Sequence, residues 1–277
     1  MQSLHSTIQG TIFRRAPFRA RLLRILMMKI LFHPAVLSVA LATALSSCTP
    51  TAPPTQEDYD PTRYLPPGLR YVDDVAPTVQ VDLKYSGQDN FVGRAVDGYR
   101  GKRAILRRDA AEALKRAADI LCKQGYGLLV WDAYRPMRAL RDFRAWSRTP
   151  DTSTQAIFYP RITKQGIYDG HYIGDQSEHC WGIAVDLTLI HLATGKQVDM
   201  GGRHDFLDPS SATDSPAVTP AQRANRQLLR QAMRAAGFAN YSKEWWHYRL
   251  SNSEPWTAYD IPVRDDYDTH PSEKSMR

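Results

Sequence analysis

The sequence of 277 residues contains only three cysteines, and no acidic residue occurs in its first 47 positions. So few cysteines exclude a disulfide framework, and none has the spacing of a cysteine-based zinc site. The 16 glycines follow no triplet period and no long repeat is present, which excludes collagen-like chains, solenoids and propellers. A hydrophobic share of 43% and a charged share of 23% are ordinary for a globular protein, which excludes wholesale disorder and a multi-span membrane protein.

The net charge of +7 is concentrated at the amino terminus. Six of the 36 basic residues lie among residues 1–47, which leaves 30 basic and 29 acidic residues in the remainder. The body of the protein is therefore almost neutral and lacks the basic surface that binds phosphate backbones. We expect no nucleic-acid partner.

Residues 1–47 are predicted to be a secretory signal peptide, because a short basic region precedes an apolar stretch and small residues. Met28 and Lys29 precede the apolar stretch from Ile30 to Leu45, which is shorter than the roughly 20 residues of a membrane span. Since this signal is complete from Met28, the true start is expected at Met27 or Met28.

The sequence Leu45-Ser46-Ser47-Cys48 resembles the cleavage box of bacterial lipoproteins, in which the cysteine is acylated and becomes the first mature residue. Residues 48–70 are then the lipidated Cys48 and a Pro-rich tether. Several acyl chains anchor a protein stably, so we expect an exported lipoprotein that is held at a membrane and faces the periplasm or the cell exterior. Ordinary cleavage near Ala44, with Cys48 incidental, is the alternative.

Residues 71–263 are predicted to form one domain, followed by a flexible tail over residues 264–277. Three segments have apolar residues at helical spacing: residues 107–124, a segment after Pro136, and residues 220–236. Three short apolar runs are predicted to be strands: residues 126–131, 182–189 and 245–250. Since helices and strands do not alternate as βαβ units, the expected fold class is α+β, with a central, largely antiparallel sheet flanked by helices.

Two short segments carry imidazoles beside carboxylates. The first contains His179 and Asp186, and the second contains Glu244 and His247. Zinc prefers such nitrogen and oxygen donors, and a catalytic zinc site keeps three protein ligands and a water. The pattern predicts His179, Asp186 and His247 as ligands, with Glu244 free to accept a proton from that water.

Residue spacing sets a condition on this site. In an ideal strand Glu244 and His247 face opposite sides of the sheet, as do His179 and Asp186. Gly182 offers a bend in the first segment, and Glu244 must precede the strand in the second. The structural alternative is that Asp186 is a hydrogen-bonded core residue and that the two tryptophans after Glu244 are core as well.

The combined pattern Ser-x-His-x-x-Gly-x-Ala-x-Asp and Glu-Trp-Trp-His resembles the zinc D-alanyl-D-alanine dipeptidases of the vancomycin-resistance type. These enzymes are related to D,D-carboxypeptidases and Hedgehog-like domains. The likeness covers residues 71–263 and includes further segments in family order: residues 82–85, 89–93, 96–99, 131–136 and 200–206.

The resemblance implies that one zinc ion per chain is held by His179, Asp186 and His247, and that Glu244 is the general base and acid. Arg135 corresponds to the arginine that stabilises the tetrahedral oxyanion, and a forked, permanently charged guanidinium suits that role. The alternative for Arg135 is a surface ion pair.

The resemblance also implies a substrate site. Asp205 and Tyr85 correspond to the residues that bind the substrate amine, and Ser177 corresponds to a serine near the substrate. Cys180 occupies a variable position, for which we expect no chemical role. Three further histidines are interpreted as solvated loop residues: His171, His191 and His204.

The activity implied by the resemblance is hydrolysis of the small D,D-dipeptide D-Ala-D-Ala to two D-alanines. An exported enzyme meets dipeptide from the cell wall, so we expect a role in wall-peptide turnover or salvage. The alternatives are a zinc D,D-carboxypeptidase acting on longer peptidoglycan peptides and a non-catalytic wall-binding domain. A cysteine hydrolase is disfavoured because the adjacent His179 and Cys180 cannot easily face each other. No protein partner is evident.

Overall fold

The computed structural model describes residues 60, 62–251, 253 and 258–271. Within them, the main sheet has five strands in the order β2-β4-β5-β7-β6. Their bounds are β2 Gln80–Val81, β4 Tyr126–Asp132, β5 Ala184–His191, β7 His247–Leu250 and β6 Phe238–Asn240. The β2–β4 pair is parallel and the other three pairs are antiparallel, which confirms the predicted α+β class with a largely antiparallel sheet.

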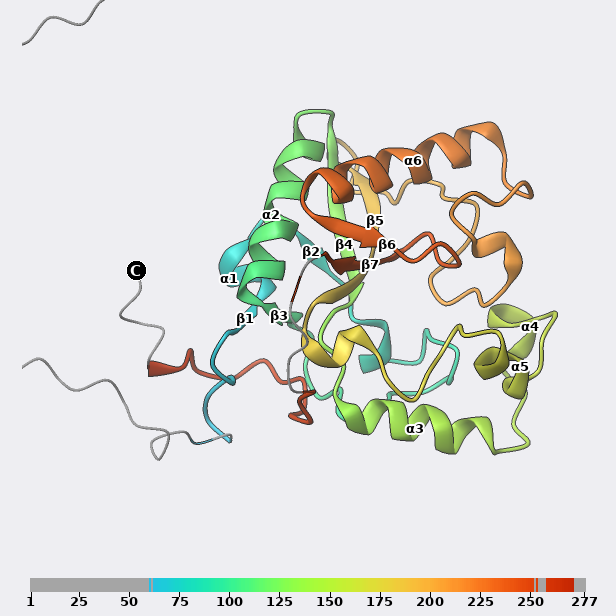
Figure 1. Cartoon of the computed structure of the whole chain (residues 1–277), viewed down its shortest axis with the longest axis horizontal. Coiled ribbons are helices and arrows are strands. Elements are labelled where there is room, and N and C mark those ends of the chain that lie inside the picture. The colour runs from blue at the N-terminus through green and yellow to red at the C-terminus, as the bar shows by residue number, and fades with distance from the viewer. Residues whose placement is uncertain (1–59, 61, 252, 254–257, 272–277) are drawn as a thin grey trace, which may run out of the picture. The chain divides into compact units, whose positions relative to one another are not determined.

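Two long helices pack together beside this sheet (Figure 1). Helix α2 (Arg108–Cys122) contacts β4, and helix α6 (Pro220–Ala235) contacts β6. The start of α6 is specified locally: the side chain of Thr219 accepts a hydrogen bond from the backbone of Gln222, whose side chain accepts one from the backbone of Thr219. This capping box satisfies two backbone N–H groups that a helix terminus leaves unpaired.

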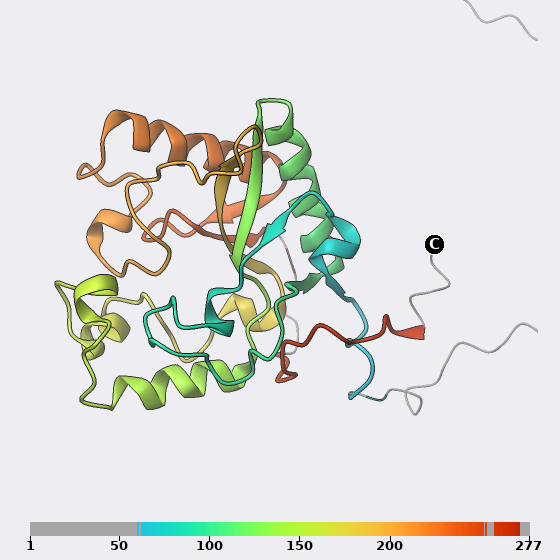
Figure 2. The same cartoon turned by 180° about the vertical axis from the view of Figure 1, so that it is seen from behind.

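Helix α3 (Met137–Ser147) lies on the opposite side of the structure from α6, with the short helices α4 (Gln155–Phe158) and α5 (Lys164–Asp169) near its end (Figure 1). Its predicted apolar stripe is buried: Leu140, Phe143 and Trp146. The segment between β2 and β3 (Ile105–Arg107) runs beside α3 (Figure 2), and Arg94 in it forms an ion pair with Asp142 of α3. This segment includes the 3-10 helix η2 (Lys84–Ser86), which carries Tyr85.

A second, two-stranded antiparallel sheet lies near the start of the domain. It pairs β1 (Leu69–Tyr71) with β3 (Ile105–Arg107), and the short helix α1 (Val72–Val75) follows β1. The remaining 3-10 helices are η3 (Glu178–Trp181), directly before β5, and η4 (Pro209–Ser211), before α6.

The packed body begins earlier and ends later than the predicted range 71–263. Leu65 and Leu69 are buried, so residues 62–70 are not tether. Tyr267 and His270 are also buried, and a parallel bridge joins Tyr64 to Asp268, so the predicted tail packs against the start of the domain. The two ends stabilise each other, which no local pattern in either segment indicates.

The predicted signal peptide over residues 1–47 and the predicted lipidation site Cys48 lie outside the described residues. Among the residues that the structure does describe, no helix is both long enough and apolar enough to cross a bilayer.

Candidate metal site and substrate cavity

The first predicted ligand, His179, lies in the 3-10 helix η3, directly before strand β5. Ser177 caps this helix, and its side chain accepts a hydrogen bond from the backbone N–H of His179. Gly182 ends the helix with φ +68°, where a Cβ atom would lie 3.1 Å from the backbone nitrogen of Arg107. Only glycine combines this backbone conformation with such a close approach, and the turn lets His179 and Asp186 face the same space.

The second segment meets the first through strand register. Asp186 on β5 is the direct partner of His247 on β7, and Asp132 at the end of β4 flanks Asp186 on its other side. His247 is the first residue of β7, and Glu244 lies in the preceding turn, where its carbonyl accepts from the backbone N–H of His247. The structure thus meets both conditions that residue spacing imposed: the bend lies at Gly182, and Glu244 precedes the strand.

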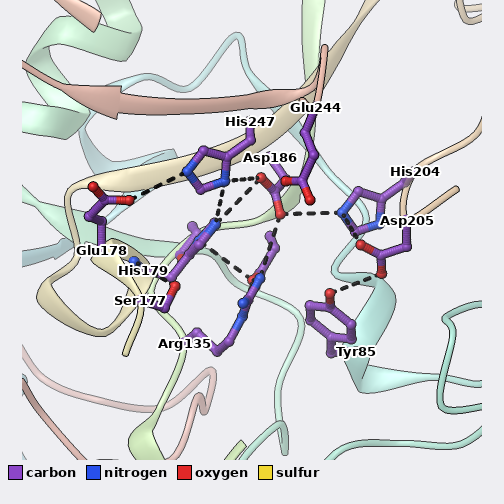
Figure 3. A network of polar contacts seen from close by, with 12 residues as sticks. Tyr85, Arg135, Ser177, Glu178, His179, Asp186, His204, Asp205, Glu244 and His247 are labelled. Atoms are coloured by element: carbon purple, nitrogen blue, oxygen red, sulfur yellow. Dashed lines mark hydrogen bonds and ion pairs between the residues drawn. The ribbon is translucent and has the colours of Figure 1, made fainter. Parts of the chain in front are cut away.

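Three donor atoms converge at this point (Figure 3). His179 Nε2 lies 3.1 Å from His247 Nδ1, and Asp186 Oδ1 lies 3.4 Å from the first and 3.0 Å from the second. A tetrahedral zinc ion with bonds of about 2.0–2.2 Å holds its ligand atoms roughly 3.3–3.6 Å apart. The donor set and its spacing therefore fit zinc after movements of a few tenths of an ångström.

Neighbouring groups turn the correct atom of each histidine toward this point. His179 Nδ1 donates to the backbone oxygen of Ala133 at 2.6 Å, which leaves Nε2 without a hydrogen and able to bind a metal. Nε2 of His247 faces a carboxylate oxygen of Glu178 at 3.7 Å, so a metal that displaces the proton from Nδ1 leaves the remaining hydrogen on Nε2. Such outer partners set the orientation of metal ligands.

The carboxylate of Asp186 is buried and its two oxygens have different neighbours. Oδ1 faces the two histidine ligand atoms, whereas Oδ2 lies 3.3 Å from His204 Nε2 and 3.6 Å from a guanidinium nitrogen of Arg135. Burial alone would raise the pKa of Asp186, but His179 and the hydrogen bonds of the surrounding imidazoles hold it well below its usual range. Asp186 is therefore ionised, as a metal ligand must be.

A cavity of about 260 Å³ opens beside the three donors. It is lined by all eight residues that the sequence assigned to catalysis, substrate binding and metal binding: Tyr85, Arg135, Ser177, His179, Asp186, Asp205, Glu244 and His247. Pockets for drug-sized ligands measure roughly 300–1,000 Å³. This cavity therefore suits a smaller molecule.

Two buried carboxylic acids in the cavity have raised pKa values. Burial raises the pKa of Glu244 to about 8, although the nearby His247 opposes the shift. Burial also raises the pKa of Asp205, which accepts a hydrogen bond from Tyr85 at 2.9 Å. A nearby cation or hydrogen-bond donor would stabilise the ionised form of either group and lower its pKa.

Arg135 is buried, with 8% of its surface exposed, so the alternative of a surface ion pair is wrong. Its guanidinium pairs with Asp132 at 2.8 Å and reaches Asp186 at 3.6 Å. Asp132 also accepts from the hydroxyl of Tyr99 at 2.6 Å. Arg135 is thus held at the wall of the cavity by two contacts with Asp132.

Sequence comparison adds independent evidence. Residues 67–273 match the family model described as D-ala-D-ala dipeptidase. The chain belongs to this family. The match covers the whole sheet and every residue of the cavity, and it extends into the terminal segment that packs against the start of the domain.

Several relatives carry the name D-alanyl-D-alanine dipeptidase. The protein of Streptomyces coelicolor is 44% identical over 195 residues, which cover 70% of this chain and 96% of the relative. The protein of Enterococcus faecium is 39% identical over 199 residues, with coverage of 71% and 98%. Among solved structures, a vancomycin-resistance D,D-pentapeptidase in complex with Zn(II) has a TM-score of 0.31 and 16% identity, covering 53% of this chain and 73% of that chain.

The sequence interpretation of His204 as a solvated loop residue is wrong. Its side chain is buried and contacts both Asp186 and Asp205, at 3.3 and 3.4 Å. Its position beside Asp205 was the only local signal, since its other neighbours come from distant segments. His171 and His191 are exposed, as predicted, but His191 is the last residue of strand β5 and not a loop residue.

Sequence reasoning also missed Glu178 and Asp132, which contact His247 and Arg135. The two cysteines of the domain, Cys122 and Cys180, are not paired with each other. Burial raises the pKa of the Cys180 thiol to about 11, which makes it a poor nucleophile.

Proposed function

We propose that this chain is a zinc-dependent dipeptidase that hydrolyses D-alanyl-D-alanine to two D-alanines. One observation carries the proposal: three donor atoms from two distant segments meet at zinc-binding separations, at the edge of a small cavity. The same cavity contains an acid, a cation and an amine-binding carboxylate. The relatives named D-alanyl-D-alanine dipeptidase support the choice of substrate.

In this proposal His179, Asp186 and His247 hold a single zinc ion. When bound, zinc supplies Lewis acidity and lowers the pKa of a water toward neutrality. Glu244 takes the proton from the attacking water and passes it to the leaving amine. Burial raises the pKa of Glu244 to about 8 in the metal-free protein, and a bound cation would lower it toward neutrality, where a carboxylate can both accept a proton and return it.

Arg135 is proposed to hold the negative charge that develops on the peptide oxygen. Its guanidinium is buried, permanently charged and already fixed by Asp132, so little reorganisation is needed when the charge appears. A lysine would place a single point charge on a flexible stem instead of a forked pair of donors.

Asp205 and Tyr85 are proposed to bind the free amine of the dipeptide. The buried carboxylate of Asp205 lies at the cavity wall and is held by the hydroxyl of Tyr85. An ammonium group would compensate its charge, whereas an amide at the same place would leave it unpaired. Selectivity for a free amine follows from that difference. Ser177, the N-cap residue of η3, lines the same cavity and is proposed to lie near the substrate.

The wall of the cavity also favours a short substrate over the longer peptides of a D,D-carboxypeptidase. Residues 171–174 and 176 line one side, and two hydrogen bonds hold this segment: Tyr241 Oη donates to the backbone oxygen of His171, and Lys243 Nζ donates to that of Gly170. These bonds attach the wall to the segment that carries Glu244. A fixed wall beside a cavity of about 260 Å³ favours a small substrate.

Release of D-alanine from D-Ala-D-Ala and from its N-acetylated form tests the proposal directly. We expect the free dipeptide to be cleaved, the acetylated form to be cleaved far more slowly, and both activities to disappear on chelation. Faster cleavage of the acetylated substrate would instead identify a carboxypeptidase. A folded, zinc-containing protein that cleaves neither would support a wall-binding domain.

We also propose that the protein is exported and anchored through acylated Cys48, for turnover or salvage of wall-derived dipeptide. The sequence of residues 28–48 supports this proposal. Metabolic labelling with a radioactive fatty acid should mark the wild-type protein and not the Cys48→Ala variant. Unlabelled wild-type protein released in soluble form would favour ordinary signal cleavage.

A further inference from the structure

His204 is an imidazole enclosed by aromatic side chains. It is 4% exposed, and its ring centre lies 5.2 Å from that of Trp131, 5.8 Å from that of Trp246 and 6.0 Å from that of Tyr85. A phenylalanine would fill such a space without needing any polar partner. A histidine here requires hydrogen-bond partners for its nitrogens, and the partners of Nε2 are informative.

His204 Nε2 lies between two carboxylates that have different proposed roles (Figure 3). It is 3.3 Å from Oδ2 of Asp186, a proposed metal ligand, and 3.4 Å from Oδ1 of Asp205, the proposed amine-binding residue. An ionised carboxylate only accepts hydrogen bonds, so Nε2 carries the hydrogen that bonds Asp186, while the same nitrogen contacts Asp205 as an ion-pair partner.

The contact with Asp186 determines which of its oxygens remains available for a metal. His204 and Arg135 both face Oδ2, and the two histidine ligand atoms face Oδ1. Without the donor at His204, the carboxylate could rotate and lose its single metal-directed oxygen. Hydrogen bonds of this kind to metal ligands typically contribute 10–100-fold to metal affinity or activity.

The contact with Asp205 fixes the other carboxylate. Tyr85 donates to Oδ2 of Asp205 at 2.9 Å, and His204 faces Oδ1. The backbone of Asp205 has φ +57°, a left-handed conformation that is uncommon outside glycine but that aspartate adopts more often than most residues. The two side-chain contacts hold the carboxylate at the cavity.

We propose that His204 is a positioning residue that joins the metal site to the amine site: its Nε2–H group bonds Asp186, and the same nitrogen contacts Asp205. The metal half of this inference rests on the ligand geometry alone. The amine half rests on the proposed dipeptidase function. His204 thereby sets the relative placement of the zinc ion and the substrate's amino end.

Substitution of His204 separates this role from simple packing. His204→Phe keeps the aromatic contacts and removes the Nε2 donor, while His204→Gln keeps a donor close to the position of Nε2. We expect His204→Phe to bind zinc about 10–100-fold more weakly in competition with a chelator. At saturating zinc, its KM for D-Ala-D-Ala should rise about 10-fold, more than kcat falls, and His204→Gln should recover most of both losses. His191→Phe, at an exposed histidine, is the matched control and should change neither value.

Wild-type zinc affinity and KM in a folded His204→Phe variant would overturn the proposal and leave His204 as a core residue. If His204→Phe does not fold, His204→Asn replaces it, because its shorter amide cannot reach both carboxylates; equal zinc affinity in the Asn and Gln variants would then overturn the proposal. If the wild-type protein fails to cleave D-Ala-D-Ala, the proposed function fails. The zinc measurements then still decide the role of His204 toward Asp186.

Discussion

His179 Nε2 and His247 Nδ1 lie 3.1 Å apart, although 68 positions separate the two residues in the chain. His179 already donates through Nδ1 to a backbone oxygen, so its Nε2 lone pair points at the partner ring. Two lone pairs cannot face each other at this distance without a cation or a proton between them. The fold thus prepares a site that is occupied either by a metal or by a proton.

Competition between zinc and protons follows from this geometry. Burial alone would lower the pKa of His247, but hydrogen bonds to Asp186 and Glu178 raise it to about 10 in the metal-free protein. Between pH 6.5 and 8.5 zinc must therefore displace this proton, and its apparent affinity should rise about tenfold per pH unit. Chelator competition at several pH values measures the slope, and a flat profile would show that His247 is neutral in the metal-free protein.

Replacement of Glu244 by Gln should abolish turnover and leave zinc binding intact. The amide fills the same volume but cannot take a proton from water, so kcat should fall about 10²–10⁴-fold. Zinc content and thermal stability should remain at wild-type levels, because Glu244 is not among the three converging ligands. Retained turnover in zinc-loaded Glu244→Gln would show that another group is the base.

Replacement of Arg135 by Lys tests the proposed oxyanion contact. The single ammonium should remain near Asp132 and lose the forked reach toward the cavity, so kcat should fall about 10²–10³-fold with a smaller change in KM. Arg138→Lys is the matched control, because Arg138 also pairs with a carboxylate, Asp260, but does not line the cavity. An equal loss of kcat in both variants would indicate a general effect on α3 and its start.

The sequence predicted those parts of the molecule whose causes are local. The helix ending before Gly125, the strand from Tyr126 and the helix beginning at Pro220 lie within two residues of their predicted limits. The bend at Gly182 and the place of Glu244 before its strand were also predicted, because side chains alternate between the two faces of a strand and the site residues must face the same side. All eight residues that the motif pattern assigned to the site line one cavity, so the pattern predicted which side chains lie together.

The features that sequence reasoning missed depend on contacts between distant segments. Nothing near Tyr267 indicates that it packs against Tyr71, whose hydroxyl accepts from its backbone N–H at 2.9 Å. His204 is flanked by polar residues, yet Trp131 and Trp246 enclose it from two other segments. Burial of a single polar residue in a loop is therefore decided by the fold, and local hydropathy does not reveal it.

Asp208 should contribute to stability in a pH-dependent way, because its side chain is 1% exposed and pairs with that of Arg161, which is 63% exposed. The hydrogen bond from Arg161 lowers the pKa of Asp208 to about 2 in the folded protein, although burial opposes it. A carboxylate with a depressed pKa stabilises the fold fully above its ordinary pKa of 3.8, and this contribution is lost as the pH falls toward about 2. Arg161→Gln should therefore unfold at a lower temperature than wild type at pH 7, and the difference should shrink as the pH falls from about 4 toward 2.

Lys115→Gln, which breaks an exposed pair with Asp119, is the control and should show no such convergence. Melting curves that stay equally separated from pH 7 to pH 2 would show that Arg161 acts on stability by packing and not through the charge of Asp208.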